Sequence, residues 1–208
     1  IKIMPKLSIK PSKAIILASG SKIRAKIMKK TGIQFSVKTS FVDEELIKKT
    51  ISSKSIGKQA EILACAKASK VSEKNLNSYV IGSDQICSIN NLILNKPLNT
   101  VNAIKQLKLL SGKTHKQTSA ICLYYKGNKL WSYSEEAKLT MHKLNISEIK
   151  NYISLDKPFQ SCGSYKFESN GHHLFSKVTG DSYIIQGFPL ISLLEQLRKY
   201  KLYSLKNN

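Results

Sequence analysis

Leu17-Ala18-Ser19-Gly20-Ser21-Lys22-Ile23-Arg24 decides the fold class of this 208-residue chain, because it has the pattern of a strand that runs into a helix. The apolar run 14–18 has the length of a short buried strand. Gly20 and Ser21 then turn the chain and cap a helix that is expected to end at Gly32. The sequence therefore predicts a helix that starts directly after a buried strand.

The same turn gathers groups that bind phosphate. Ser19 and Ser21 supply hydroxyls, and the start of a helix supplies unpaired backbone N–H groups with partial positive charge. Arg24 and Arg198 are the only arginines in a chain with 34 basic residues. An arginine kept in so lysine-rich a chain indicates that a planar, two-pronged contact is needed. We therefore expect Ser19, Ser21 and Arg24 to hold a phosphate group.

Composition and charge fit one globular domain. Hydrophobic residues make up 41% of the chain, and its length allows a core that is stable by itself. We expect a single domain over 14–200, with a basic extension at 1–13 and a tail at 201–208. The formal net charge of +21 would suit a nucleic acid or an anionic membrane surface. Because the lysines are scattered over the whole length, we favour compositional drift and expect no specific nucleic acid and no membrane partner.

The cysteines favour a reducing compartment. They lie far apart and show neither the spacing of a zinc site nor that of a disulfide framework: Cys65, Cys87, Cys122 and Cys162. No stretch is long and apolar enough to span a membrane, and the run 14–18 is too short for the hydrophobic region of a signal peptide. We therefore expect reduced thiols in a cytoplasmic protein.

Segments with strand and helix patterns alternate along the chain. Strands are predicted at 14–18, 35–39, 79–89, 114–125 and 130–141, with a hairpin over 86–94 that turns at Asn90-Asn91. Helices are predicted at 21–31, 55–74 and 100–110, and then from Ser147 and from Pro189. Such alternation is typical of an α/β protein with a mixed sheet.

Acidic residues are scarce, so their positions carry information. Asp43-Glu44-Glu45 follows a predicted strand, and Asp84 comes at the end of the apolar run 80–83. A carboxylate at that position is either a paired structural group or a catalytic or metal-binding one, and the residues alone leave both interpretations open. Lys67 and Lys96 stand among so many lysines that each would ordinarily be a surface residue.

Other chemical signals favour ordinary structural roles. In a strand, His172 and His173 would point to opposite faces, so we expect no metal site there. The sequence contains neither a P-loop nor the glycine motif of dinucleotide-binding proteins. Tyr124-Tyr125, Trp131 and Tyr133 are expected in the sheet core, because no RNA-binding signature surrounds them.

Taken in order, the motifs resemble those of the Maf family of nucleoside triphosphate pyrophosphatases, from residue 14 to about 200. Each motif is weak alone, but so many in register are a strong signal. The matching segments are Leu17–Ser21 with Arg24, Val42–Glu44, Ala66–Ala68, Ile81–Gln85, Asn95–Pro97, Ser111–His115, Gly163–Tyr165, Gly180–Asp181 and Gly187–Leu190. The resemblance implies an α/β fold like that of the Maf and inosine triphosphatase group, a mixed sheet with flanking helices in two lobes around a cleft.

The resemblance also implies the reaction. It is hydrolysis between the α- and β-phosphates of noncanonical or modified nucleotides, which gives a nucleoside monophosphate and pyrophosphate. Arg24, Lys67 and Lys96 would neutralise the phosphate chain and the charge that develops on the leaving group. Ser19 and Ser21 would hold phosphate oxygens at the helix start.

The same resemblance assigns roles to acidic residues. Asp84 would be the general base for the attacking water, with Glu44 and Gln85 beside it in the catalytic group. Glu44, Asp84 and Glu168 would hold Mg²⁺ or Mn²⁺, because hard divalent cations take oxygen ligands. The metal would lower the pKa of the water, and Gln85 and Glu168 would orient the water, the metal or the base.

The chain departs from the family pattern at Ile23, where many members have the first arginine of a pair. That departure favours the alternative, a nucleotide-binding regulator of septum formation with weak or no catalysis, whereas the full set of acids and lysines favours the enzyme. Gln85 and Glu168 are closer to the subgroup that acts on 7-methyl-GTP than to the one that acts on dTTP and UTP. Since members often form dimers, a homodimer stands beside the nucleoside triphosphate substrate among the expected partners.

Overall fold

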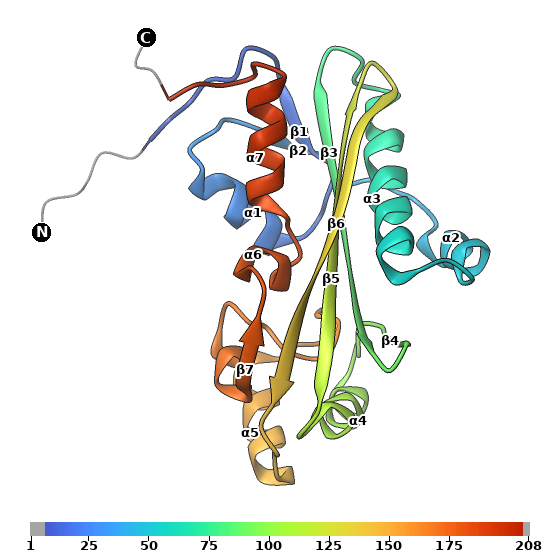
Figure 1. The fold of residues 1–208 in the computed structure, drawn as a ribbon, viewed down its shortest axis with the longest axis vertical. Helices are drawn as coiled ribbons and strands as arrows, with labels where there is room; N and C mark the ends of the chain where they lie inside the picture. Colours follow the sequence, from blue (N-terminus) through green and yellow to red (C-terminus); the bar gives the residue numbers. More distant parts are fainter. Residues whose placement is uncertain (1–6, 206–208) are drawn as a thin grey trace, which may run out of the picture. The chain divides into compact units, whose positions relative to one another are not determined.

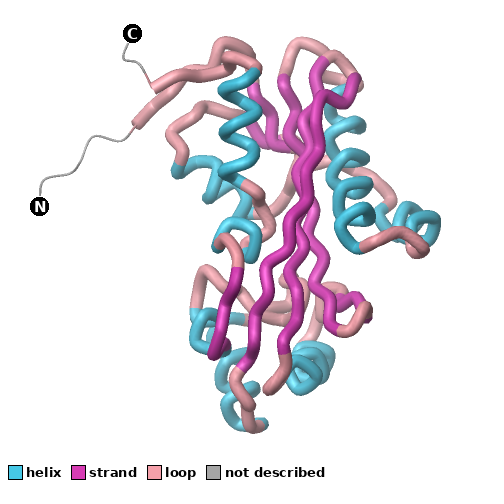
Figure 2. The backbone as a smooth tube through the Cα atoms, in the orientation of Figure 1, coloured by secondary structure: helices cyan, strands magenta, loops and turns pink. Residues whose placement is uncertain are grey.

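The computed structural model describes residues 7–205, in which strands and helices alternate (Figure 1 and Figure 2). The strands are β1 (Ile15–Leu17), β2 (Ser36–Val37), β3 (Tyr79–Ile89), β4 (Leu92–Leu94), β5 (Thr114–Tyr125), β6 (Asn128–Met141) and β7 (Phe175–Thr179). The helices are α1 (Lys22–Lys30), α2 (Glu44–Ile51), α3 (Ile56–Ser72), α4 (Thr100–Leu110), α5 (Ile146–Asp156), the 3-10 helix η1 (Asn170–Leu174), α6 (Ser182–Ile185) and α7 (Leu190–Lys199). None of the described helices combines the length and the apolar character needed to cross a membrane.

The described strands form one mixed sheet, which confirms the predicted α/β class. The hydrogen-bonded strand order is β2-β1-β3-β5-β6-β7. β4 pairs with β3 in the predicted hairpin, which Asn90 and Asn91 close with positive φ angles. β1 runs parallel to β2 and β3, whereas β7 runs antiparallel to β6. The chain divides into two compact units, and β3, β5 and β6 each contribute residues to both.

The first unit consists of the segments 1–84, 120–134 and 188–208. Leu17 of β1 pairs with Val37 of β2 on one side and with Ile81 of β3 on the other. Figure 1 shows α3 and α7 on opposite sides of these strands. Because the three strands are parallel and in register, the chain segments that follow them begin side by side.

The segments that flank 14–200 also pack on the first unit where they are described. Ile9 forms a parallel bridge with Ile33, and the backbone N–H of Ser12 donates to the carbonyl oxygen of Leu202 at 2.9 Å. Leu202 itself is buried. Residues 1–6 and 206–208 of the expected extension and tail lie outside the described residues. The domain limits at 14 and 200 stay a prediction.

The second unit consists of the segments 85–119 and 135–187, and α4 packs against α5 within it. α5 begins with a capping box, in which the Asn145 side chain accepts from the N–H of Glu148 and the Glu148 carboxylate accepts from the N–H of Asn145. The predicted start at Ser147 is therefore wrong. Asn145 and Glu148 have the spacing that satisfies both backbone donors at once.

Two other local predictions need correction. His172 and His173 lie in η1 rather than in a strand, so their rings do not point to opposite faces but lie with centroids 4.2 Å apart. Trp131 and Tyr133 stack with centroids 6.0 Å apart, yet both are only half-buried. These two rings are therefore not part of the buried core of the sheet.

Candidate active site

Three chain segments meet where the parallel strands of the first unit end. They are 18–21 after β1, 38–43 after β2, and 82–84, the part of β3 that comes directly after the residues paired with β1. The backbone N–H of Ala18 donates to the carbonyl oxygen of Ile81 at 2.7 Å, and the N–H of Lys38 donates to that of Leu17 at 3.1 Å. The carboxyl ends of parallel strands are where α/β proteins ordinarily bind ligands.

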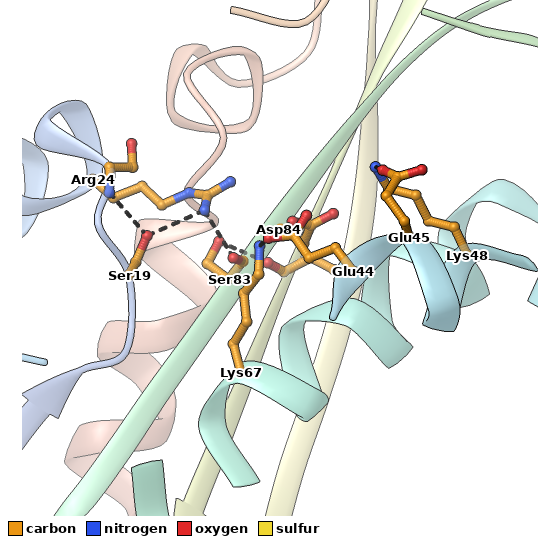
Figure 3. A network of polar contacts seen from close by, with 10 residues as sticks. Ser19, Arg24, Glu44, Glu45, Lys48, Lys67, Ser83 and Asp84 are labelled. Carbon is orange, nitrogen blue, oxygen red and sulfur yellow. Dashed lines mark hydrogen bonds and ion pairs between the residues drawn. The ribbon is translucent and has the colours of Figure 1, made fainter. Parts of the chain in front are cut away.

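Lys67 lies between two carboxylates at this end of the sheet (Figure 3). Its Nζ is 2.6 Å from Oδ1 of Asp84 and 2.9 Å from Oε1 of Glu44. The side chains of Lys67 and Asp84 are each only 11% exposed, whereas that of Glu44 is 42% exposed. One ammonium between two carboxylates leaves this trio, Glu44, Lys67 and Asp84, with one excess negative charge. The trio can therefore attract a further cation.

Small residues bring the lysine and the aspartate together. Ala60, Ala64 and Ala68 are fully buried on α3, which lets the helix backbone approach β3 closely. A Cβ atom added at Gly82 would lie 2.0 Å from the carbonyl oxygen of Ala64, so only glycine fits there. Lys67 leaves α3 one turn beyond Ala64, and the Asp84 carboxylate reaches it from β3.

Arg24 connects the turn at 19–21, which is predicted to bind phosphate, to the same end of β3 (Figure 3). Its Nη1 donates to the carbonyl oxygen of Ser83 at 2.8 Å and to Oγ of Ser19 at 3.3 Å. The Ser83 hydroxyl in turn donates to the carbonyl oxygen of Ala120 on β5 at 2.8 Å. The guanidinium predicted to bind phosphate is therefore held one residue away from Asp84.

Ser21 is the N-cap residue of α1, as predicted. Its side chain makes no capping hydrogen bond, and its backbone N–H donates to Oγ of Ser19 at 3.3 Å. The first turn of α1 thus has donors that the cap does not use, as an anion site requires.

Lys48 belongs to the polar network although its sequence position did not single it out (Figure 3). Its Nζ lies 2.9 Å from Oε1 of Glu45. Partial burial lowers the pKa of Lys48, but the carboxylates of Glu45, Glu44 and Asp84 outweigh burial and raise it above its usual value. The signal that could have found it is the four-residue spacing from Glu44 to Lys48, which places both on one face of a helix.

Gln85, Lys96 and Glu168 belong to the second unit. The Gln85 amide donates to the carbonyl oxygens of Ile184 at 3.3 Å and Ile185 at 2.7 Å, so it anchors α6 within that unit. Lys96 is exposed in the turn between β4 and α4, and Glu168 is exposed just before η1. The roles expected for these three residues stay predictions.

The donor set of the trio is suited to a hard divalent cation. Glu44 and Asp84 direct carboxylate oxygens at one point, which the ammonium of Lys67 occupies. Mg²⁺ is commonly held by one or two carboxylates together with waters and substrate phosphate oxygens, so two protein ligands suffice. Within residues 7–205, no cluster of three or more His, Cys, Asp or Glu side chains could hold a metal.

Known proteins share most of the length of this chain. Among solved structures, the Ham1 protein of Staphylococcus aureus is 14% identical, with a TM-score of 0.48, 90% of this chain covered and 99% of that one. The nucleoside triphosphate pyrophosphatase of Legionella pneumophila (strain Lens) is 41% identical over 189 residues, 91% of this chain and 94% of that protein. The 7-methyl-GTP pyrophosphatase of Brucella abortus biovar 1 (strain 9-941) is 39% identical over 191 residues, 90% of this chain and 96% of that protein. The family model described as Maf-like protein matches residues 14–200, and the chain therefore belongs to the Maf family.

Proposed function

We propose that this protein hydrolyses nucleoside triphosphates between the α- and β-phosphates and releases a nucleoside monophosphate and pyrophosphate. The observation that carries the proposal is the trio, in which Lys67 lies between Asp84 and Glu44 beside a turn with phosphate-binding chemistry. The names of the relatives in Legionella and Brucella support it. They favour an enzyme over a purely regulatory nucleotide-binding protein.

In the proposed reaction, cationic groups of the first unit hold the phosphate chain. Arg24 already donates to Oγ of Ser19, so its guanidinium and the Ser19 hydroxyl lie together and would bind the same phosphate group. Lys67 would exchange one of its carboxylate contacts for a phosphate oxygen and offset the charge that grows on the departing pyrophosphate. Lys96 is proposed to contribute a further ammonium.

Asp84 is proposed as the general base. As Lys67 turns toward the phosphate chain, Oδ1 of Asp84 becomes able to accept a proton from water. The water oxygen then bonds to phosphorus while the bond to the leaving pyrophosphate breaks, and the proton stays on the carboxylate. A positioned base of this kind contributes a factor of about 10² to 10⁴ in rate.

Glu44 and Asp84 are the residues that would hold Mg²⁺ or Mn²⁺, with Glu168 as a further proposed ligand. The metal would neutralise phosphate charge and make water easier to deprotonate. The chain's own contribution is to keep two carboxylates together by means of Lys67 and to leave Glu44 open enough to meet a phosphate-bound ion.

We further propose that the reaction takes place in the cytoplasm. All four cysteines are free thiols, and two of them, Cys87 and Cys122, are buried in the core. Free thiols throughout a chain are characteristic of proteins that work in reducing surroundings.

The experiment that tests the proposed function is a pyrophosphate-release assay with a panel of canonical and modified nucleoside triphosphates, including 7-methyl-GTP, with Mg²⁺ or Mn²⁺. We expect metal-dependent release by the wild type and a drop of about 10² to 10⁴ for Asp84→Asn. Glu73→Gln is the matched control, since it makes the same carboxylate-to-amide change at an exposed position of the first unit, where Glu73 pairs with Lys70.

Two results would refute the proposal. One is the absence of release from every nucleotide while binding is intact, which would favour the regulatory alternative. The other is an Asp84→Asn variant that stays within a few-fold of the wild type. Among nucleotides that are cleaved, the preferred base identifies the subgroup to which the enzyme belongs.

A further inference from the structure

Phe41 is an aromatic side chain that the fold leaves in water. It is 88% exposed, the highest value among the large apolar side chains of residues 7–205. Single exposed apolar residues are common, so exposure alone points to no function. What distinguishes Phe41 is its place in the chain, between two parts of the candidate active site.

Phe41 lies in the segment 38–43. The first residues of this segment contact the turn at 19–21 and the strand before it. The backbone N–H of Lys38 donates to the carbonyl oxygen of Leu17 at 3.1 Å. The next residue, Thr39, lies against Gly20, because a Cβ atom added at Gly20 would be 3.6 Å from both the methyl and the hydroxyl of Thr39. Phe41 therefore follows, by two residues, a contact with the turn that would hold phosphate.

The same segment is attached to the trio at its end. Oδ1 of Asp43 accepts from the N–H of Leu46 at 2.9 Å and so caps α2. Glu44, the first residue of that helix, has its carboxylate 2.9 Å from Nζ of Lys67. Both ends of the segment are thus held in position, which leaves Phe41 exposed near the middle of a short, anchored connection.

The length of this connection limits where Phe41 can be. A residue spans at most about 3.6 Å, so the backbone of Phe41 lies within about 7 Å of Thr39 and about 11 Å of Glu44. A nucleotide whose phosphates meet the Ser19 turn and Lys67 carries its base one sugar ring away from them. An exposed ring at this distance is well placed to meet the face of that base.

We propose that Phe41 is a substrate-binding residue that stacks on the nucleobase, an inference that rests on the proposed pyrophosphatase function. Stacking recognises the flat face that every base has, and it therefore raises affinity without selecting a hydrogen-bonding edge. The face of an aromatic ring also attracts cations. A purine that carries positive charge, as 7-methylguanine does, should accordingly gain more from Phe41 than guanine does.

The test compares substrates with and without a base. KM and kcat for pyrophosphate release are measured with GTP, 7-methyl-GTP and ribose 5-triphosphate, for the wild type, Phe41→Ala and Phe41→Tyr. We expect Phe41→Ala to raise KM about tenfold for GTP, and more for 7-methyl-GTP, while its effect on ribose 5-triphosphate is clearly smaller. Phe41→Tyr keeps the ring and should restore the KM values of the wild type.

Leu76→Ala is the matched control, because Leu76 is another exposed apolar residue of the first unit, beside the Gly127 turn. This substitution should leave KM and kcat unchanged for all three substrates. Equal KM changes for nucleotides and ribose 5-triphosphate in Phe41→Ala would overturn the proposal, and so would no change in any of them.

Failure of the proposed function gives a different result. If the wild type releases no pyrophosphate, the affinities of wild type and Phe41→Ala for GTP and for ribose 5-triphosphate are measured by calorimetry instead. A loss of affinity in Phe41→Ala that is confined to GTP would support stacking in a binding protein. Equal affinities for both proteins would overturn it.

Discussion

The ammonium of Lys67 lies 2.6 Å from Oδ1 of Asp84, and each side chain is 11% exposed. The two residues come from different elements, α3 and β3, and meet because Gly82 lets the helix backbone approach the strand. A pair so far removed from water is costly to form and still more costly to break on one side. Its presence where parallel strands end favours a role in chemistry over a role in stability alone.

Removing the cation should destabilise the fold and abolish activity. In Lys67→Met, the carboxylates of Asp84 and Glu44 lose the charge that compensates them, and we expect the free energy of unfolding to fall by about 3 kcal/mol. Asp84→Asn in the same chain should recover part of that loss. Urea denaturation of the two single variants and the double variant measures the coupling. Strictly additive effects would show that the pair is not energetically linked.

Arg24→Lys should not be silent. Nη1 of Arg24 alone donates to the Ser83 carbonyl oxygen and to Oγ of Ser19, and a lysine at this position would lack the other planar guanidinium N–H groups with which arginine would bind phosphate. We expect kcat/KM for pyrophosphate release to fall about tenfold, the cost of a lost charge-assisted hydrogen bond. Arg198→Lys on α7 makes the same change at an exposed position and should leave kcat/KM unchanged. Equal kcat/KM values for the two variants would show that Arg24 does not bind the phosphate chain.

Glu44→Gln should weaken the affinity for the metal rather than the stability of the fold. Because the charge of the ligands sets the affinity for a hard cation, we expect the Mg²⁺ concentration for half-maximal rate to rise roughly tenfold. Glu45→Gln is the control, since the neighbouring carboxylate pairs with Lys48 on the same helix. The role assigned to Glu44 fails if titrations with Mg²⁺ give the same midpoint for both variants.

His115 should make the protein less stable in mild acid. Burial lowers its pKa from 6.5 to about 4, so the imidazole stays neutral in the fold while the unfolded chain binds a proton below pH 6.5. The contribution of the neutral His115 side chain to the free energy of unfolding is complete above pH 6.5 and is lost as the pH falls toward 4. Between pH 7 and pH 5 this amounts to about 2 kcal/mol.

The measurement for His115 is the free energy of unfolding at several pH values, for the wild type, His115→Gln and His142→Gln. His142 is exposed, so its variant should keep the slope of the wild type. His115→Gln should flatten the slope, even though it also loses the 2.9 Å contact with the Tyr165 hydroxyl. A slope that His115→Gln leaves intact would assign the pH dependence to other groups.

Local patterns in the sequence predicted much of the fold. The run 79–89 is β3, the hairpin turns at Asn90-Asn91, and the helix predicted at 100–110 is α4, because these signals lie within a few residues of one another. Elements with little local signal were missed. β7 is almost fully exposed and shows no apolar alternation, and α6 has only four residues.

The site was harder to derive from the sequence than the fold. On composition alone Lys67 is one lysine among many, and only the family resemblance singled it out. Its burial depends on the contact between Ala64 and Gly82, residues of different elements, and no periodicity reports such a contact. Lys48 was missed for a related reason, since α2 was not predicted and the Glu44-to-Lys48 spacing therefore had no helix to lie on.

The most direct test of the central claim identifies the products of cleavage. ³¹P NMR follows a preferred nucleoside triphosphate with Mg²⁺, first with the wild type and then with Asp84→Asn. Cleavage between the α- and β-phosphates predicts equal amounts of nucleoside monophosphate and pyrophosphate with the wild type, and almost unchanged triphosphate with the variant. Formation of a nucleoside diphosphate and orthophosphate, or the same products at the same rate with Asp84→Asn, would contradict the account.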